Sequence, residues 1–409
     1  MKRLLLAASL LLACQTARPL LVAARGDAPA PGAVLFEEVR IFDGLEASGP
    51  ADVLIEGGRI AGIGPHGSFA DAKALRIDGR GKTLLPGLID CHVHLGGGDG
   101  KPPWTAGRPN PDAQSTALLY SGVTTILAAS RDTDLQKMKA RIASGELAGP
   151  RIIASSRIIT ATGGHPVPFI KALLPWPISS LALGRRVAEV GSEEEARKAV
   201  DEELKGGGPE FVKIVYDDIP PGSPRLSRAV LGAIIAEVKA KGRRASVHIG
   251  SPEEALDAVA AGAALLMHVP GDALLTAEQA RSLAKSGVPI VTTVRMYAVL
   301  AAGLRKALSF SPLEREVMPP GTAEDFLHPP EGYRVPGFPQ DYLDSLLVLR
   351  MATVDAAMVL DPKADYGAIA AGLRADLLLV DGGPLTDITA TERIVSVWQD
   401  GRRVERVAR

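Results

Sequence analysis

Residues 85–94 read Leu-Pro-Gly-Leu-Ile-Asp-Cys-His-Val-His, an apolar segment that ends in His92 and His94. In a β-strand, side chains two residues apart point to the same face, so both imidazoles would converge on one point. Neutral imidazole is a common ligand of zinc and similar divalent metals. The motif therefore predicts a catalytic metal site. The alternative is a buried strand whose histidines are satisfied by hydrogen bonds.

Two further histidines and one lysine fall within apolar, strand-like segments. His248 and His268 each stand near the end of such a segment, and the helix-like stretch 251–262 separates them. Lys213 interrupts the apolar segment 211–216, and a buried lysine is costly unless it has partners or loses its charge. Strand and helix alternate along the middle of the chain, with polar residues at the strand ends. This is the layout of a (β/α)₈ barrel, whose active site lies at the carboxyl ends of the strands.

These motifs resemble the amidohydrolase superfamily, and within it the binuclear branch of imidazolonepropionase-like and Xaa-Pro dipeptidase-like enzymes. The resemblance spans roughly residues 33–409 and includes the tail motif Gly-Ala-Ile at 367–369 and Ala-Asp-Leu at 375–377. It implies an α/β fold: a TIM-like (β/α)₈ barrel with a small β-sandwich formed by the N- and C-terminal segments. It also implies two divalent metal ions, with zinc the first candidate. The implied ligands are His92 and His94 for one ion, His248 and His268 for the other, and Lys213 bridging both as a carbamate.

Three more residues are candidates for contacts with substrate. His165, after the strand-like segment 151–160, resembles the substrate-side histidine of this branch, which would polarise the scissile carbonyl. Tyr216 and Arg295 follow two other strand-like segments, where they could bind a substrate carboxylate. Exposed loop residues of these two types are also commonly structural.

The sequence predicts seven of the eight barrel strands. Seven strands are predicted, at 85–94, 123–129, 151–160, 211–216, 244–249, 264–268 and 289–294, with helices at 192–205, 227–241, 251–262, 276–286 and 297–308. Members of the family carry an eighth strand ending in Gly-Thr-Asp or Gly-Ser-Asp, and its Asp binds the first metal. Here a Pro-rich stretch follows instead. Residues 321–325, Gly-Thr-Ala-Glu-Asp, look similar but lack a preceding apolar strand, so we expect a solvated loop there.

The N-terminus predicts export. A basic start and a short apolar run lead to Leu-Leu-Ala-Cys at 11–14, which resembles a lipoprotein box with Cys14 as the lipidated residue. Cleavage after Ala24 would instead give a soluble secreted form. We expect a periplasmic or outer-membrane-anchored bacterial lipoprotein. Its predicted parts are a signal peptide (1–14), a tether (15–32), the β-sandwich (33–84 with 366–409) and the metal-dependent barrel (85–365).

Charge and motifs together define the expected function. The 409 residues carry a net charge of −1, which gives no reason to expect nucleic acid or an anionic membrane surface as a partner. Membrane contact is expected only through the lipid anchor, and a homo-oligomer is compatible with the sequence. The predicted reaction is hydrolysis of a C–N bond (amide, peptide or cyclic amide) in a small-molecule or dipeptide-like substrate by a metal-activated water. The alternative is a degenerate, non-catalytic barrel that binds metal or a small ligand, because the strand-8 Asp is not found.

Overall fold

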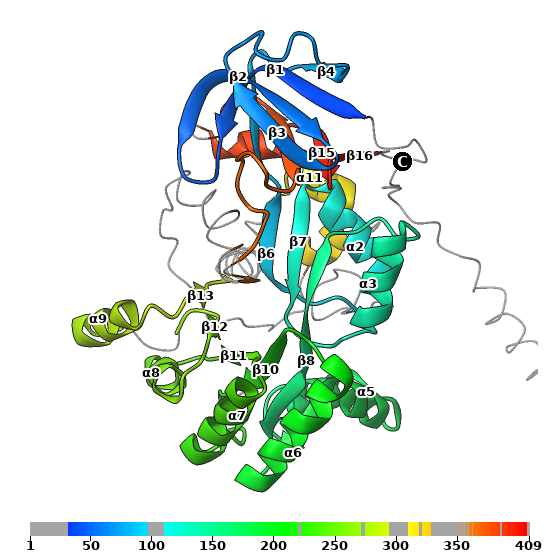
Figure 1. Cartoon of the computed structure of the whole chain (residues 1–409). Coiled ribbons are helices and arrows are strands. Elements are labelled where there is room, and N and C mark those ends of the chain that lie inside the picture. Colours follow the sequence, from blue (N-terminus) through cyan, green and yellow to red (C-terminus); the bar gives the residue numbers. More distant parts are fainter. Residues whose placement is uncertain are drawn as a thin grey trace, which may run out of the picture.

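Two β-sheets and a set of covering helices make up the described part of the chain (Figure 1). The computed structural model describes residues 32–96, 110–219, 222–270, 275–293, 310–318, 321–328, 353, 357, 360–361, 363–384 and 387–406. The predicted signal peptide with Cys14, nearly all of the tether, Arg295 and the predicted helix 297–308 lie outside the described residues. In the described part, no helix is long and apolar enough to cross a membrane.

The first sheet joins the two ends of the described chain. Its strand order is β16-β15-β14-β5-β1-β2-β3, with β4 beside β1. The core of this sheet includes Phe36 and Trp398, whose rings meet edge to face with centroids 5.5 Å apart. Its strands are β1 (Ala33–Phe42), β2 (Ala47–Glu56), β3 (Arg59–Gly64), β4 (Leu75–Asp78), β5 (Lys82–Pro86), β14 (Leu377–Asp381), β15 (Ile394–Gln399) and β16 (Arg402–Val404).

The second sheet is parallel throughout and forms the barrel. Its order is β13-β12-β11-β10-β8-β7-β6, with β9 beside β8. All seven predicted strands are present, and β9 is an addition that the sequence reading missed. The strands are β6 (Leu88–Val93), β7 (Val123–Ala128), β8 (Arg151–Ala161), β9 (Val187–Val190), β10 (Phe211–Val215), β11 (Arg244–His248), β12 (Leu265–Met267) and β13 (Ile290–Val291).

The first predicted barrel strand is two strands. The segment 85–94 divides at Gly87, so that β5 belongs to the first sheet and β6 to the barrel. A Cβ at Gly87 would lie 2.2 Å from Oγ1 of Thr124, so only glycine fits where the chain passes from one sheet to the other.

Helices cover the outer face of the barrel. The predicted helices 192–205, 227–241, 251–262 and 276–286 correspond to α6, α7, α8 and α9, each of which begins after a Ser or Thr cap. The helices are α2 (Pro111–Tyr120), α3 (Leu135–Ser144), α4 (Val167–Leu173), α5 (Ile178–Arg186), α6 (Glu193–Leu204), α7 (Arg228–Ala240), α8 (Pro252–Ala261), α9 (Ala277–Ser286), α11 (Pro312–Val317) and α12 (Thr322–Leu327), with short 3₁₀ segments η1 (Lys205–Gly207) and η2 (Ile388–Glu392).

Among the described residues, no eighth strand joins β13 to β6. The stretch 321–325, expected as a solvated loop, instead begins the helix α12, with Gly321 as its N-cap and Thr322 fully buried. Asp325 therefore lies within a helix and does not end a strand, as the metal-binding Asp of the resemblance would. The expectation of a loop is wrong, because backbone hydrogen bonds of helical spacing form here, from Asp325 N–H to the Gly321 carbonyl oxygen at 2.9 Å and from His328 N–H to that of Glu324 at 3.1 Å.

Candidate metal centre

Five histidines meet at the carboxyl ends of the barrel strands. His92 and His94 come from the end of β6, His268 follows β12, His248 ends β11, and His165 lies in the loop after β8. Their rings form a continuous series: the centroid distances are 5.2 Å from His94 to His92, 4.6 Å from His92 to His268, 4.1 Å from His268 to His248 and 4.9 Å from His248 to His165. Parallel strands bring residues far apart in sequence to one edge, as the barrel prediction requires.

Three of these imidazoles are held in the neutral form that binds metals. Burial, reinforced by the positive charge of Lys213, lowers the pKa of His92 well below its ordinary value. Burial likewise lowers the pKa of His248 to about 4, although its hydrogen bond with Asp217 opposes this shift. The pKa of His268 is also strongly lowered, by burial and then by His248. The buried Nδ1 atom of His92 has no hydrogen-bond partner, so its ring has ligand capacity that the protein does not use.

Lys213 lies among these rings. It is 1% exposed, and its Nζ donates a hydrogen bond to Sδ of Met267 at 3.3 Å. Burial lowers its pKa to about 7, against the opposing effect of Asp217 and Asp132. Alternation along β10 explains the position: Val212 and Ile214 pack in the core cluster that includes residues of α6 and α7, and Lys213 faces the other way, into the barrel.

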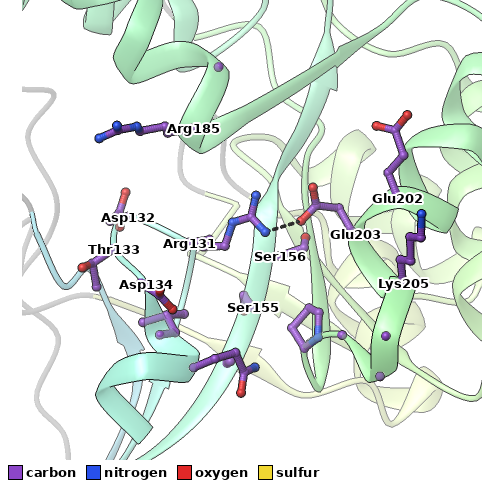
Figure 2. Close-up of a pocket in the computed structure, with 18 residues that line it drawn as sticks. Arg131, Asp132, Thr133, Asp134, Ser155, Ser156, Arg185, Glu202, Glu203 and Lys205 are labelled. Atoms are coloured by element: carbon purple, nitrogen blue, oxygen red, sulfur yellow. Dashed lines mark ion pairs between the residues drawn. The ribbon is translucent and has the colours of Figure 1, made fainter. Parts of the chain in front are cut away.

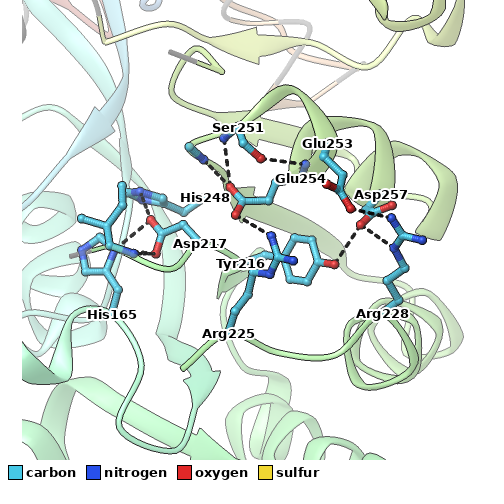
Figure 3. A network of polar contacts seen from close by, with 12 residues as sticks. His165, Tyr216, Asp217, Arg225, Arg228, His248, Ser251, Glu253, Glu254 and Asp257 are labelled. Atoms are coloured by element: carbon cyan, nitrogen blue, oxygen red, sulfur yellow. Dashed lines mark hydrogen bonds and ion pairs between the residues drawn. The ribbon is translucent and has the colours of Figure 1, made fainter. Parts of the chain in front are cut away.

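Asp217 is a site residue that the sequence reading missed. Its carboxylate accepts hydrogen bonds from Nδ1 of His165 at 2.8 and 2.9 Å, and it lies 2.8 Å from Nε2 of His248 (Figure 3). Burial acts to raise the pKa of Asp217, but the hydrogen bonds of the two histidines outweigh it and hold the pKa well below its usual range. One ligand atom from each of these three residues lies within 4.8 Å of the others, so the trio could hold a metal ion.

Asp132 is a second missed carboxylate, at the other end of the histidine series. Its Oδ2 lies 2.8 Å from Nδ1 of His94 and accepts a hydrogen bond from Oγ of Ser130 at 2.7 Å. A carboxylate on one imidazole nitrogen fixes the ring so that the other nitrogen faces a metal. Both acids follow the end of a predicted barrel strand, and this signal was available in the sequence.

His268 is positioned by its backbone and by Thr293. It has φ +74° and Thr293 has φ +50°, values that cost residues other than glycine roughly 1–3 kcal/mol each. Nδ1 of His268 lies 2.6 Å from Oγ1 of Thr293, which leaves Nε2 for the rest of the cluster. Such strain persists where the surrounding structure imposes it, and functional sites are common examples.

The structure corrects the substrate role expected for Tyr216. The residue is 1% exposed, and its hydroxyl donates to Asp257 of α8 at 3.0 Å. The Arg225 guanidinium stacks 5.2 Å from the ring centroid. Figure 3 shows the Tyr216 side chain pointing away from His165 and His248. The physical reason is the two-residue period of β10, which sends Tyr216 outward to α7 and α8 when Lys213 points inward.

A cavity of about 1040 Å³ lies next to Asp132, the partner of His94 (Figure 2). It is bordered by the loop after β7, the middle of β8 and the end of α6, and Asp132 lines one edge. Arg131 and Glu203, both in its lining, form an ion pair at 3.7 Å. Among the described residues that line it there is no histidine or cysteine. We therefore place the candidate catalytic centre at the histidine series.

Comparison with protein families agrees with this geometry. The model of the amidohydrolase family matches residues 83–307 and 333–404, more than half of the chain. Adenine deaminase of Escherichia coli O9:H4 (strain HS) is 41% identical over 112 residues, which cover 26% of this chain and 16% of the deaminase. The chain thus matches only a small part of that relative's length.

Solved structures match along nearly the whole chain. A crystal structure of an amidohydrolase has 27% identity and a TM-score of 0.70, and covers 91% of this chain and 98% of its own. A prolidase complexed with N-methylphosphonate-L-proline has 26% identity and a TM-score of 0.71, and covers 92% of this chain and 100% of its own. A Xaa-Pro dipeptidase with bound methionine, at 22% identity and a TM-score of 0.70, shares the fold.

Proposed function

Because this chain belongs to the amidohydrolase family, we propose that it hydrolyses a C–N bond (amide, peptide or cyclic amide) in a small, dipeptide-like substrate with the help of divalent metal ions. The observation that carries the proposal is the series of five histidine rings around the buried Lys213. The similarity to a prolidase supports a dipeptide-like substrate.

The donor set fits divalent metal ions. His92, His94, His248 and His268 would supply imidazole nitrogens, and the unpartnered Nδ1 of His92 is consistent with a ring arranged for a ligand. Zinc is our first candidate because imidazole nitrogen suits it well, although the same donors also suit other first-row metals. Bound here, the metal would lower the pKa of a water molecule and polarise the scissile carbonyl.

We propose that Lys213 carries a carbamate. Among the described residues, no carboxylate lies within 4.0 Å of its Nζ, and its hydrogen bond goes to a thioether. A buried ammonium with such weak partners would be costly. Reaction of the free amine with carbon dioxide releases one proton and leaves an anionic oxygen ligand, which would bridge two cations and remove this cost.

The side chains that border the cluster suggest where the substrate enters. The His94 side chain is 46% exposed, whereas those of His165 and His248 are 18% and 13% exposed. Substrate would therefore approach from the side of His94. Asp132 would keep the His94 ring in place during binding, because it holds Nδ1 by a 2.8 Å contact.

An activity assay tests the proposal. Purified protein is incubated with zinc or manganese and a panel of Xaa-Pro dipeptides, N-acyl amino acids, cyclic ureides and adenine, with and without chelator. We expect turnover that the chelator abolishes and that the variant His92→Asn/His94→Asn lacks. Bound metal without turnover of any class would favour the non-catalytic, ligand-binding alternative.

For localisation, we propose export and anchoring through acylated Cys14. Two or more acyl chains give stable membrane attachment, so detergent should be needed to extract the mature protein. The variant Cys14→Ser should remain unprocessed or change fraction. Identical soluble behaviour of both forms would contradict the anchor.

A further inference from the structure

We propose that His165, Asp217 and His248 together hold one of the divalent metal ions, with Asp217 as its carboxylate ligand. The inference rests on the proposed function, since it concerns the same metal centre. The sequence suggests a contact with substrate for His165, and the inference makes this residue a metal ligand instead. It also adds Asp217, which the sequence motifs did not indicate.

The geometry joins three separate segments around one carboxylate. His165 follows β8, Asp217 follows β10 and His248 ends β11, and one ligand atom of each lies within 4.8 Å of the other two. Both oxygens of Asp217 lie within 2.9 Å of Nδ1 of His165, and Oδ2 lies 2.8 Å from Nε2 of His248 (Figure 3). Two imidazoles and a carboxylate are a common ligand set for a catalytic divalent metal.

The charge balance also favours a cation at this point. Asp217 is 2% exposed, and among the described residues no Lys or Arg nitrogen lies within 4.0 Å of its carboxylate. Its side chain is held by two imidazoles and, weakly, by the backbone N–H of Ile219 at 3.4 Å. A buried carboxylate is normally paired with a cation or coordinates a metal. A divalent ion held by this trio would supply the missing positive charge.

Asp132 shows what a carboxylate with a positioning role looks like in the same cluster. It contacts one histidine, His94, and a serine hydroxyl, and Arg186 lies 3.8 Å from its other oxygen. Asp217, by contrast, contacts histidines from two different segments and has no such guanidinium. This difference separates a ligand from a residue that only orients a ring.

The test is metal binding by the full chain, measured without reference to turnover. Metal-free protein is titrated with Zn²⁺ by calorimetry, bound metal is counted by elemental analysis, and Co²⁺ is added to record the visible absorption of the site. We expect about two Zn²⁺ per wild-type chain and about one per Asp217→Asn chain, with a changed Co²⁺ spectrum. Asn keeps the size and one hydrogen-bond acceptor but removes the charge, and Asp217→Glu, which keeps the carboxylate, should recover part of the lost binding.

Asp257→Asn is the matched control. Asp257 lies on α8, and its carboxylate accepts hydrogen bonds from the Tyr216 hydroxyl and the Arg228 guanidinium. Among the described residues, it forms no hydrogen bond or ion pair with a histidine of the cluster. It should retain both Zn²⁺ ions. Should Asp217→Asn fail to fold, His165→Gln provides the same test, because it removes another member of the trio and should also lose one Zn²⁺.

Two results are decisive in opposite ways. Two Zn²⁺ ions bound with unchanged affinity and Co²⁺ spectrum in folded Asp217→Asn and His165→Gln would overturn this inference and leave the proposed function standing. A folded wild-type chain that binds no metal would overturn the proposed function together with it.

Discussion

Lys213 is the residue on which the proposed metal centre depends most directly, because it alone would contact both ions. We expect folded Lys213→Ala to lose most of both metals, because the shared ligand is removed. Elemental analysis of purified protein measures this loss. Lys241→Ala is the control, since Lys241 lies at the exposed end of α7 in ion pairs with Asp201 and Glu237 and should keep the wild-type metal content. Equal metal in both variants would contradict a ligand role for Lys213.

Thr293 should raise the Zn²⁺ affinity of the site by holding the His268 ring in place. The 2.6 Å contact between Oγ1 of Thr293 and Nδ1 of His268 fixes the imidazole, and loss of such a partner typically weakens metal binding about 10–100-fold. Thr293→Val keeps the shape and removes the hydroxyl, so Zn²⁺ affinity should fall by roughly that factor. Thr293→Ser keeps the hydroxyl and should bind nearly as wild type does. If calorimetry finds equal affinities in Val and Ser variants, the contact has no influence on the metal.

At the scale of elements, Gly367 in the tail motif packs closely against Thr353 and Ala357. It has φ +88°, and an added Cβ would lie 2.4 Å from Cβ of Ala357 and 3.1 Å from the carbonyl oxygen of Thr353. Gly372 has a similar φ of +85° with open space around it. We expect Gly372→Ala to cost about 1 kcal/mol from backbone strain alone, and Gly367→Ala about 2–4 kcal/mol because overpacking is added. Urea unfolding of both variants measures the difference, and equal losses would show that no packing conflict exists at Gly367.

Strand patterns predicted most of the barrel and part of its site. The seven strands are predictable because parallel strands give apolar runs. Four of the histidines stand near the ends of such runs, and Lys213 stands within one of them. The substrate contact expected for Tyr216 conflicts with the two-residue alternation of β10, in which Tyr216 faces the side opposite to Lys213. The same alternation places Lys213, Val215 and Asp217 on one face, so it predicts that Asp217 points toward the site. The contact of Asp217 with both His165 and His248 depends on how β8, β10 and β11 pair, which the sequence alone does not specify.

At the scale of the whole molecule, a polar interface joins the first sheet to the barrel. Arg151, the first residue of β8, lies 2.9 Å from Oδ2 of Asp376 and 3.5 Å from Oδ1 of Asp400, both in the tail. Nε2 of Gln399 donates to the carbonyl oxygens of Thr124 and Gly149 in the barrel at 3.3 and 3.2 Å. These contacts hold the first sheet against β7 and β8 of the barrel.

The Arg151–Asp376 pair gives this interface a pH dependence. The Asp376 side chain is 2% exposed, and burial raises its pKa despite the opposing effects of Arg151 and the Asp400 backbone N–H. Its Oδ2 has no well-directed hydrogen bond, so Arg151 acts on it chiefly through charge. A carboxyl whose pKa is raised on folding stabilises the fold below its unfolded pKa, and this contribution is lost as pH rises through the folded value. Arg151 limits that loss at neutral pH.

Removal of the guanidinium should therefore destabilise the protein most at neutral pH. We expect Arg151→Met to lose about 3 kcal/mol near pH 7, because a buried charge is left unpaired. The loss should shrink as the pH falls and Asp376, whose pKa is raised, takes up a proton. Arg197→Met, which breaks an exposed pair with Glu193, should lose less than about 1 kcal/mol at either pH. Urea unfolding at several pH values makes the comparison, and Arg151→Met/Asp376→Asn should remove the extra pH dependence. If the loss of unfolding free energy in Arg151→Met does not change with pH, Arg151 stabilises the interface through packing and not through the charge of Asp376. The packing would include its stacking on the Tyr366 ring, at 4.6 Å from the ring centroid.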